Sequence, residues 1–224
     1  MSLTKPISLE IERISETPYL PPGSIYCPEH PLTLEEFYEL VDEDSKAELV
    51  DGVIIMPSYA STPHEKISSF LHVTMGGYVS ARSLGMVLGS HSLVRITSYT
   101  GREPDLLFVR KERYSIITEK EITGAPDLIV EIISPDDYPR EVTSKQAQYE
   151  LIGVSELWLV GLLRKRVTQL LLDENGRYQI AFQGTEGTLH CKVIEGFAIQ
   201  VEWLWREPTE FPSEYEVLRG LLQD

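Results

Sequence analysis

Gly124-Ala-Pro-Asp-Leu-Ile-Val-Glu-Ile-Ile-Ser-Pro135 is the segment from which the core of this chain can be predicted. Its centre, residues 127–133, has the length and the β-branched composition of a buried strand. One carboxylate, Glu131, interrupts the apolar run. Because side chains alternate between the faces of a strand, Glu131 shares a face with Ile129 and Ile133. Burying a carboxylate costs free energy unless it is protonated, hydrogen-bonded or bound to a cation, so Glu131 is a candidate functional residue.

A second acid opens an apolar segment upstream, Glu103-Pro-Asp-Leu-Leu-Phe-Val109. Consecutive strands with a short connection are usually neighbours in a sheet, so we expect Asp105 to lie beside Glu131. Two carboxylates and several water molecules are ligands that Mg²⁺ prefers. Such an ion lowers the pKa of a bound water and stabilises charge that builds on a phosphate. The two acids therefore predict a site for Mg²⁺ or Mn²⁺.

A helix is predicted directly after the Glu131 strand, over residues 140–152. Its first turns can lean across the end of the strand, which makes Lys145 a candidate for holding or deprotonating an attacking water. Tyr149, four residues later, lies on the same side of the helix. The alternative is that Lys145 pairs with Glu141 on a solvated face, a contact worth roughly a few tenths of a kcal/mol.

The composition of the 224 residues, 42% hydrophobic and 25% charged, suits one globular domain with appendages. The formal net charge of -15 argues against broad, tight DNA binding, because proteins that neutralise phosphates usually present a basic surface. A local basic cleft stays open as an alternative, since basic residues gather in the middle third of the chain. These are Arg95, Arg102, Arg110, Lys111, Arg113, Arg140 and Lys145.

Cys27 and Cys191 lack metal-ligand spacing, so free thiols are expected. No window approaches the roughly 18 continuous apolar residues of a membrane span. The N-terminus lacks the apolar core of a signal peptide. These features predict a cytoplasmic protein with no membrane partner.

Capping and turn signals predict the other elements. Residues 1–30, rich in proline, are expected to form an extended arm, residues 31–204 the main domain, and residues 205–224 a tail with a short helix behind Ser213. The main domain should begin with a helix after the capping box Thr33–Glu36 and a hairpin around Asp51-Gly52. Further along we expect a helix capped by Thr62 and ended by Gly85, strand material over 86–96, a strand at 156–160, a hairpin over 166–182, and strands near 192–194 and 197–203.

Four motifs follow one another in this chain: Pro104-Asp105, the segment from Ala125 to Pro135, Lys145 with Tyr149, and Gly153-Val154 before Glu156-Leu-Trp-Leu-Val160. In this combination the chain resembles the Uma2 family of endonucleases, which are similar to restriction endonucleases of the PD-(D/E)XK superfamily. The resemblance extends roughly from Leu34 to Val201. It implies an α/β (mixed α+β) fold with a central mixed sheet flanked by helices and additional β-hairpins. It also implies a divalent metal at Asp105 and Glu131.

The superfamily usually places its lysine two residues after the acid, where this chain has Ile133. In the Uma2-like variant the lysine comes from the following helix, and Lys145 matches that displaced position. The family usually has an acid after the strand with the tryptophan, whereas this chain has Gly161 at that position.

Glu48 and His64 match positions that recur in the family and could border the metal. The alternatives are an edge-strand acid beside a turn for Glu48 and a histidine at a helix terminus for His64. Tyr149 could orient Lys145 or serve as a core tyrosine.

Three other groups of residues have structural interpretations. Asp127 lies at the start of its strand, about 13 Å from Glu131, and is interpreted as a turn or cap residue. Asp136 and Asp137 are expected to cap the next helix. Trp158, Trp203 and Trp205 are expected in the core or at its rim.

The leading hypothesis is a metal-dependent endonuclease that hydrolyses DNA phosphodiester bonds. The rival is a non-catalytic nucleic-acid-binding or assembly module that keeps the fold, and the net charge is its main support. A third option is a nuclease for RNA or for damaged or branched DNA. The oligomeric state stays open, with a homodimer through the terminal helix or the 166–182 hairpin as one option.

Overall fold

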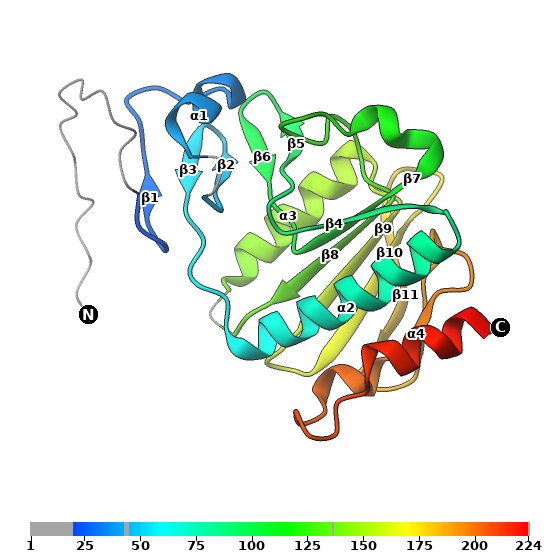
Figure 1. Cartoon of the computed structure of the whole chain (residues 1–224). Coiled ribbons are helices and arrows are strands. Elements are labelled where there is room, and N and C mark those ends of the chain that lie inside the picture. The colour runs from blue at the N-terminus through cyan, green and yellow to red at the C-terminus, as the bar shows by residue number, and fades with distance from the viewer. Residues whose placement is uncertain (1–19, 43–44, 136, 224) are drawn as a thin grey trace.

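The structure is a computed structural model that describes residues 20–42, 45–135 and 137–223. Its central layer is a six-stranded mixed sheet in the order β11-β10-β9-β8-β7-β4. Helices α2 and α3 lie on opposite sides of this sheet (Figure 1). The strands are β4 (Gly85–Gly89), β7 (Leu106–Arg110), β8 (Leu128–Ile133), β9 (Glu156–Gly161), β10 (Arg166–Leu172) and β11 (Tyr178–Gly184).

Strand β8 is the centre of the fold, because it connects the antiparallel and parallel parts of the sheet. It pairs antiparallel with β7, with Leu106 opposite Val130, and parallel with β9. A parallel pair needs a crossover connection, and α3 (Pro139–Ile152) supplies it. Gly153 ends α3 with a φ of 87°, in the left-handed region that favours glycine.

Alternation along β8 divides the core in two. Leu128, Val130 and Ile132 pack with the buried face of α2 (Thr62–Ala81), which includes Phe70. Ile129 packs on the other face with Tyr149 of α3 and its neighbours. Glu131 also points to this second face, where α3 passes over it, so the sequence pattern and the sheet place the acid under a helix.

A smaller sheet, in the order β1-β3-β2-β6-β5, lies beside the central one and has its own apolar core. Its strands are β1 (Ile25–Tyr26), β2 (Glu48–Val50), β3 (Val53–Ile55), β5 (Val94–Thr97) and β6 (Thr100–Arg102). Helix α1 (Leu34–Leu40) begins at the capping box that the sequence predicts, with Thr33 as the N-cap. The hairpin of β2 and β3 turns at Asp51 and Gly52, with φ values of 50° and 80°.

The C-terminal part covers the α2 side of the central sheet. It contains β12 (Thr188–His190), β13 (Ala198–Gln200), a 3₁₀ helix at Val201–Trp205 and α4 (Glu214–Gln223). Outside this part, another 3₁₀ helix (Lys111–Ile116) follows β7. Leu218 of α4 lies so close to Gly77 of α2 that a Cβ on the glycine would come within 2.6 Å of Leu218 Cδ2. The apolar side of α4 therefore packs on the core, with Val217, Leu218 and Leu221 partly buried.

The mixed fold, the first helix, both hairpins and the terminal helix are as the sequence predicts. Trp158 is fully buried, Trp203 and Trp205 pack against the core, and both cysteines are free, also as expected. The helix at 62–81 is capped by Ser61 rather than Thr62 and ends at Ala81, before Gly85. The segment 86–96 contributes to two strands in different sheets rather than to one bent strand.

The strand expected near 192–194 is absent from the part of the chain that the structure describes. The arm predicted over residues 1–30 lies mostly outside the described residues, and the domain boundaries stay predictions. Within the described ranges, no helix has the length and apolar composition needed to cross a membrane.

Candidate active site

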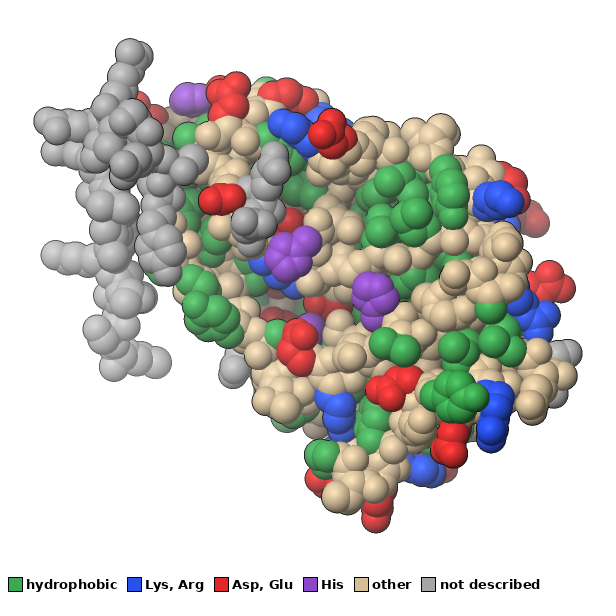
Figure 2. Space-filling model, viewed as in Figure 1, with side chains coloured by type: hydrophobic (Ala, Val, Ile, Leu, Met, Phe, Trp, Pro, Cys, Tyr) green, Lys and Arg blue, Asp and Glu red, His purple; other side chains and the backbone are tan. Residues whose placement is uncertain are grey.

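A pocket of about 350 Å³ lies where the smaller sheet, the central sheet and α3 meet. Residues of β2, β3, β8, α3, the start of α2 and the loop 57–61 line it. Figure 2 shows the surface hollowed here, with acidic and basic side chains inside the hollow. The six residues singled out in the sequence come together at this pocket or directly beneath it. They are Glu48, His64, Asp105, Glu131, Lys145 and Tyr149.

Asp105 immediately precedes β7, and the pairing of β7 with β8 brings it beside Glu131. Its Oδ2 accepts a hydrogen bond of 2.7 Å from the backbone N–H of Ile132. Its Oδ1 lies 3.2 Å from Nε2 of His64 and 3.5 Å from Nζ of Lys46. Burial raises the pKa of Asp105, but the hydrogen bond and charge of His64, together with Lys46, outweigh it and hold this pKa below its usual range.

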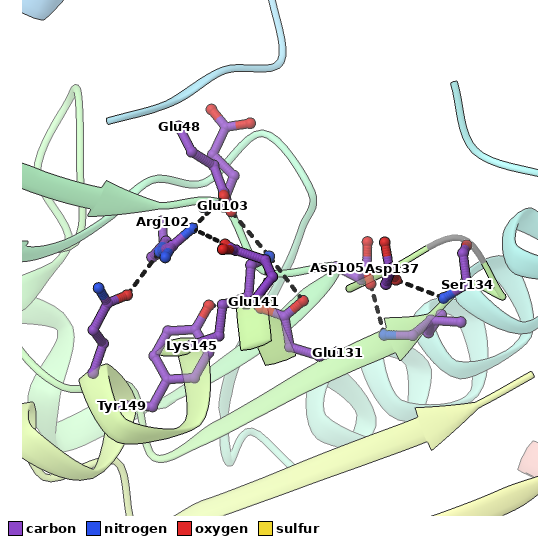
Figure 3. A network of polar contacts seen from close by, with 12 residues as sticks. Glu48, Arg102, Glu103, Asp105, Glu131, Ser134, Asp137, Glu141, Lys145 and Tyr149 are labelled. Carbon is purple, nitrogen blue, oxygen red and sulfur yellow. Dashed lines mark hydrogen bonds and ion pairs between the residues drawn. The ribbon is translucent and has the colours of Figure 1, made fainter. Parts of the chain in front are cut away.

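Glu131 is 8% exposed, and two side chains of α3 contact its carboxylate. Its Oε1 accepts a hydrogen bond of 2.6 Å from the hydroxyl of Tyr149, and Nζ of Lys145 lies 3.1 Å from Oε2 (Figure 3). Burial raises the pKa of Glu131, and the charges of Asp105 and Glu48 add to this effect against the opposing charge of Lys145. A second cation near this carboxylate would therefore be favourable.

Lys145 bridges two buried carboxylates. Its Nζ lies 3.0 Å from Oε1 of Glu48 as well as beside Glu131. Burial lowers the pKa of Lys145, but the charges of Glu131 and Glu48 outweigh it and raise this pKa well above its usual range, so the side chain stays an ammonium ion. The alternative pairing with Glu141 is wrong, because Glu141 contacts Arg102 instead.

The supporting residues occupy defined positions. Glu48 lies on β2 and binds Lys145 and Arg102, so it is a buried member of the polar network and not only an edge acid. His64 lies in the first turn of α2. Burial lowers its pKa, but the hydrogen bond and charge of Asp105 outweigh burial, so the net pKa of His64 is raised. The hydroxyl of Tyr149 contacts Glu131 and not Lys145, so Tyr149 orients the acid.

The sequence does not predict four further residues of this region. Glu103 and Lys46 line the pocket two residues before Asp105 and Glu48, and the alternation of side chains along extended backbone could have identified both. Burial raises the pKa of Glu103 to about 8, and its Oε2 is buried without a hydrogen-bond partner among the described residues. No local pattern indicates Arg102 or Asp137.

The prediction that Asp137 caps the helix after β8 is wrong. The Oδ2 of Asp137 accepts from the N–H of Ser134 at 2.6 Å, which closes a turn, and its side chain lines the pocket. The N-cap of α3 is Tyr138, which makes no capping side-chain hydrogen bond. Asp136 lies outside the described residues.

Asp127 accepts from Nη1 of Arg113 at 2.8 Å and from the N–H of Arg110 at 2.9 Å, and it lies outside the pocket lining, as expected of a structural residue.

The donor set fits a hard divalent cation with few protein ligands. Within the described residues, no three or more His, Cys, Asp or Glu side chains are arranged as a metal-binding group. Mg²⁺ favours few carboxylates completed by water or backbone oxygen, so the pair predicted from the sequence, Asp105 and Glu131, is a candidate set for such an ion. The pocket lining is rich in acidic residues, and among the described lining residues Lys46, Lys145 and His64 are the basic ones. Those acidic residues are Glu48, Glu103, Asp105, Glu131, Asp137 and Glu141.

Comparisons with known proteins agree with this architecture. A solved structure from Anabaena variabilis ATCC 29413, described as that of "a putative nuclease", is similar with a TM-score of 0.65 and 19% sequence identity. The similarity covers 78% of this chain and 98% of the other, and at this identity it shows a shared fold. No curated protein matches the chain. The Uma2 family model, whose description is "Putative restriction endonuclease", matches residues 34–202. Fold, motif order and this match over most of the chain establish that the protein belongs to the Uma2 family.

Proposed function

We propose that the protein is a metal-dependent endonuclease that hydrolyses phosphodiester bonds in DNA. The family and the nuclease-like fold support a nuclease function in general. The observation that carries the specific proposal is the convergence of Asp105, Glu131 and Lys145 on one pocket, with Lys145 Nζ 3.1 Å from Glu131.

Asp105 and Glu131 would hold Mg²⁺ or Mn²⁺, which stabilises charge on a phosphate and acidifies water when bound. The Ile132 N–H fixes the orientation of Asp105, and the Tyr149 hydroxyl fixes that of Glu131. Lys145, as an ammonium ion, can donate hydrogen bonds to a water or to a phosphate oxygen. Holding the water, rather than deprotonating it, is therefore the role that fits Lys145.

A second candidate is the non-catalytic binding or assembly module, and the arginines favour it. Arg95 is paired with Glu121 and Glu35, and Arg102 is buried with its own acids. Arg110 and Arg113 both contact Asp127. Most of the basic residues of the middle third are thus neutralised within the chain. This leaves few of them for a cleft that follows a duplex.

Plasmid nicking with Mg²⁺ tests the proposed function. We expect the parent to nick DNA, chelation to stop it, and Lys145→Ala to lower the rate by on the order of a hundredfold or more, because a preorganised cation is lost. Arg113→Ala, outside the pocket, serves as the control and should keep the parent rate. Full activity of Lys145→Ala would overturn the assignment of Lys145.

Calorimetry with Mg²⁺ or Mn²⁺ separates the two candidates. A nuclease should bind the ion in a way that Glu131→Gln abolishes. A parent protein that binds neither ion and cuts no DNA, RNA or branched substrate would support the non-catalytic module.

A homodimer and a cytoplasmic location belong to the same proposal. Because α4 already packs Val217, Leu218 and Leu221 on the core of its own chain, the β10–β11 hairpin is the better candidate for a contact between two copies.

A further inference from the structure

Arg102 is a fully buried arginine at the end of β6, with 0% of its surface exposed. Nη1 donates to Oε2 of Glu48 at 2.8 Å and to Oε1 of Glu141 at 2.5 Å, and Nε donates to Oε1 of Gln148 at 2.7 Å (Figure 3). Burying a guanidinium is costly unless its contacts are good. Arg102 does not line the pocket, so direct contact with a substrate is not its role.

The partners of Arg102 surround Lys145 on two sides. Glu48 accepts from Arg102 on Oε2 and binds Lys145 through Oε1 at 3.0 Å, so the same carboxylate connects the two cations. Glu141 and Gln148 lie one turn before and one turn after Lys145 on the same side of α3. Arg102 therefore holds both the carboxylate that anchors Lys145 and the helix that carries it.

We propose that Arg102 is a positioning residue that fastens α3 to the smaller sheet and so keeps Lys145 between Glu48 and Glu131. The planar guanidinium suits this task because it donates in several fixed directions at once, whereas a lysine ammonium is a flexible point charge. The effect on catalysis rests on the proposed nuclease function, but the effect on the position of Lys145 does not.

The first test measures the position of Lys145 without DNA or metal. An amine-reactive reagent is applied to the native protein, and labelling of each lysine is followed by mass spectrometry. In the parent, Lys145 should react slowly because its ammonium is held by two carboxylates. In Arg102→Lys we expect several-fold faster labelling of Lys145, with the other lysines unchanged.

Matched variants make this result specific. Arg113→Lys alters another arginine that pairs with a buried acid, outside the pocket, and should leave Lys145 labelling at the parent rate. Arg102→Met removes every side-chain donor to Glu48 and Glu141, whereas lysine and glutamine keep one. Arg102→Lys and Arg102→Gln therefore carry the test if the methionine variant fails to fold. Parent-like labelling of Lys145 in any correctly folded Arg102 variant would overturn the proposal.

The second test uses nuclease kinetics. A misplaced Lys145 should lower kcat by on the order of tenfold to a hundredfold with little change in KM. In a Lys145→Ala background, Arg102→Lys should cost nothing further, because both changes remove the same contribution. Additive losses would overturn the proposal. An inactive parent would count against the nuclease function alone, and labelling would still decide the role of Arg102.

Discussion

Glu103 illustrates how strongly this pocket perturbs a single side chain. The residue is 8% exposed and shares the pocket with Glu48, while the charge of Lys46 only partly offsets the cost of burial. Burial raises its pKa from 4.5 to about 8, so the protonated form is favoured in the folded protein at neutral pH. A neutral carboxyl can donate a hydrogen bond, which the surrounding carboxylates cannot do.

This shift predicts a pH dependence of stability. Since the folded pKa exceeds the unfolded one, the contribution of Glu103 is fully present below about pH 4.5 and is lost as the pH rises through about 8. The loss should be on the order of a few kcal/mol. Urea unfolding at several pH values measures the free energy of unfolding, which should fall less with rising pH in Glu103→Gln than in the parent. The same pH dependence of the free energy of unfolding in both proteins would contradict the prediction.

Much of the candidate site follows from the sequence for a physical reason. Asp105 and Glu131 are acids in apolar strands. The place of Lys145 on the next helix makes it a candidate beside the Glu141 pairing, and the resemblance to the Uma2 family selects it. The positions of Arg102 and Asp137 depend on how the smaller sheet and the turn before α3 meet the central sheet. No local sequence pattern encodes these long-range contacts, so Arg102 and Asp137 could not be assigned to the site from the sequence.

Helix α3 depends on its C-terminal glycine, because Gly153 has a φ of 87°. Alanine there should lower the free energy of unfolding by about 1 kcal/mol through backbone strain alone. An added Cβ would meet no atom within 4 Å. Gly220→Ala in α4 is the matched control, since its Cβ is equally free of contacts but its backbone is helical, and it should stabilise by roughly 0.5–1 kcal/mol. Urea unfolding measures the free energy of unfolding of both variants. Equal changes in Gly153→Ala and Gly220→Ala would contradict the role of Gly153 as the left-handed end of α3.

Elements set by local chemistry are predicted well, and those set by distant partners are not. The capping box at Thr33 and the turn at Asp51 act over a few residues. The strand expected at 192–194 fails because the N–H groups of Lys192 and Val193 bind the buried carboxylate of Glu156, at 2.8 and 3.0 Å. Gly85 serves close packing rather than helix termination, since its Cβ would lie 2.2 Å from the carbonyl oxygen of Val109.

The charge of the whole molecule limits where a second copy can approach. Each chain carries a net charge of -15, so most faces repel each other. Strand β11 (Tyr178–Gly184) is an end strand of the central sheet and has no charged residue, and its Ile180 is 62% exposed. An uncharged edge of this length favours pairing with another strand.

If the proposed homodimer forms through this edge, Ile180→Lys should convert it to a monomer, because the lysine places a charge on the edge where the two strands would pair. Sedimentation velocity measures the mass against that of the 25.4 kDa chain. Val73→Lys, an exposed position on α2, is the control and should leave the mass unchanged. A parent that is monomeric at tens of micromolar would refute the homodimer.

The parallel pairing of β8 with β9 also sets when the site can form during synthesis. Glu48, Arg102 and Glu131 leave the ribosome before α3, but β8 gains its parallel partner only after α3 and β9 have emerged. Lys145 follows Glu131 by 14 residues, so at about 5–20 residues per second it emerges roughly 0.7 to 3 seconds after that acid. Assembly of the site is therefore delayed until most of the matched region, residues 34–202, has been translated.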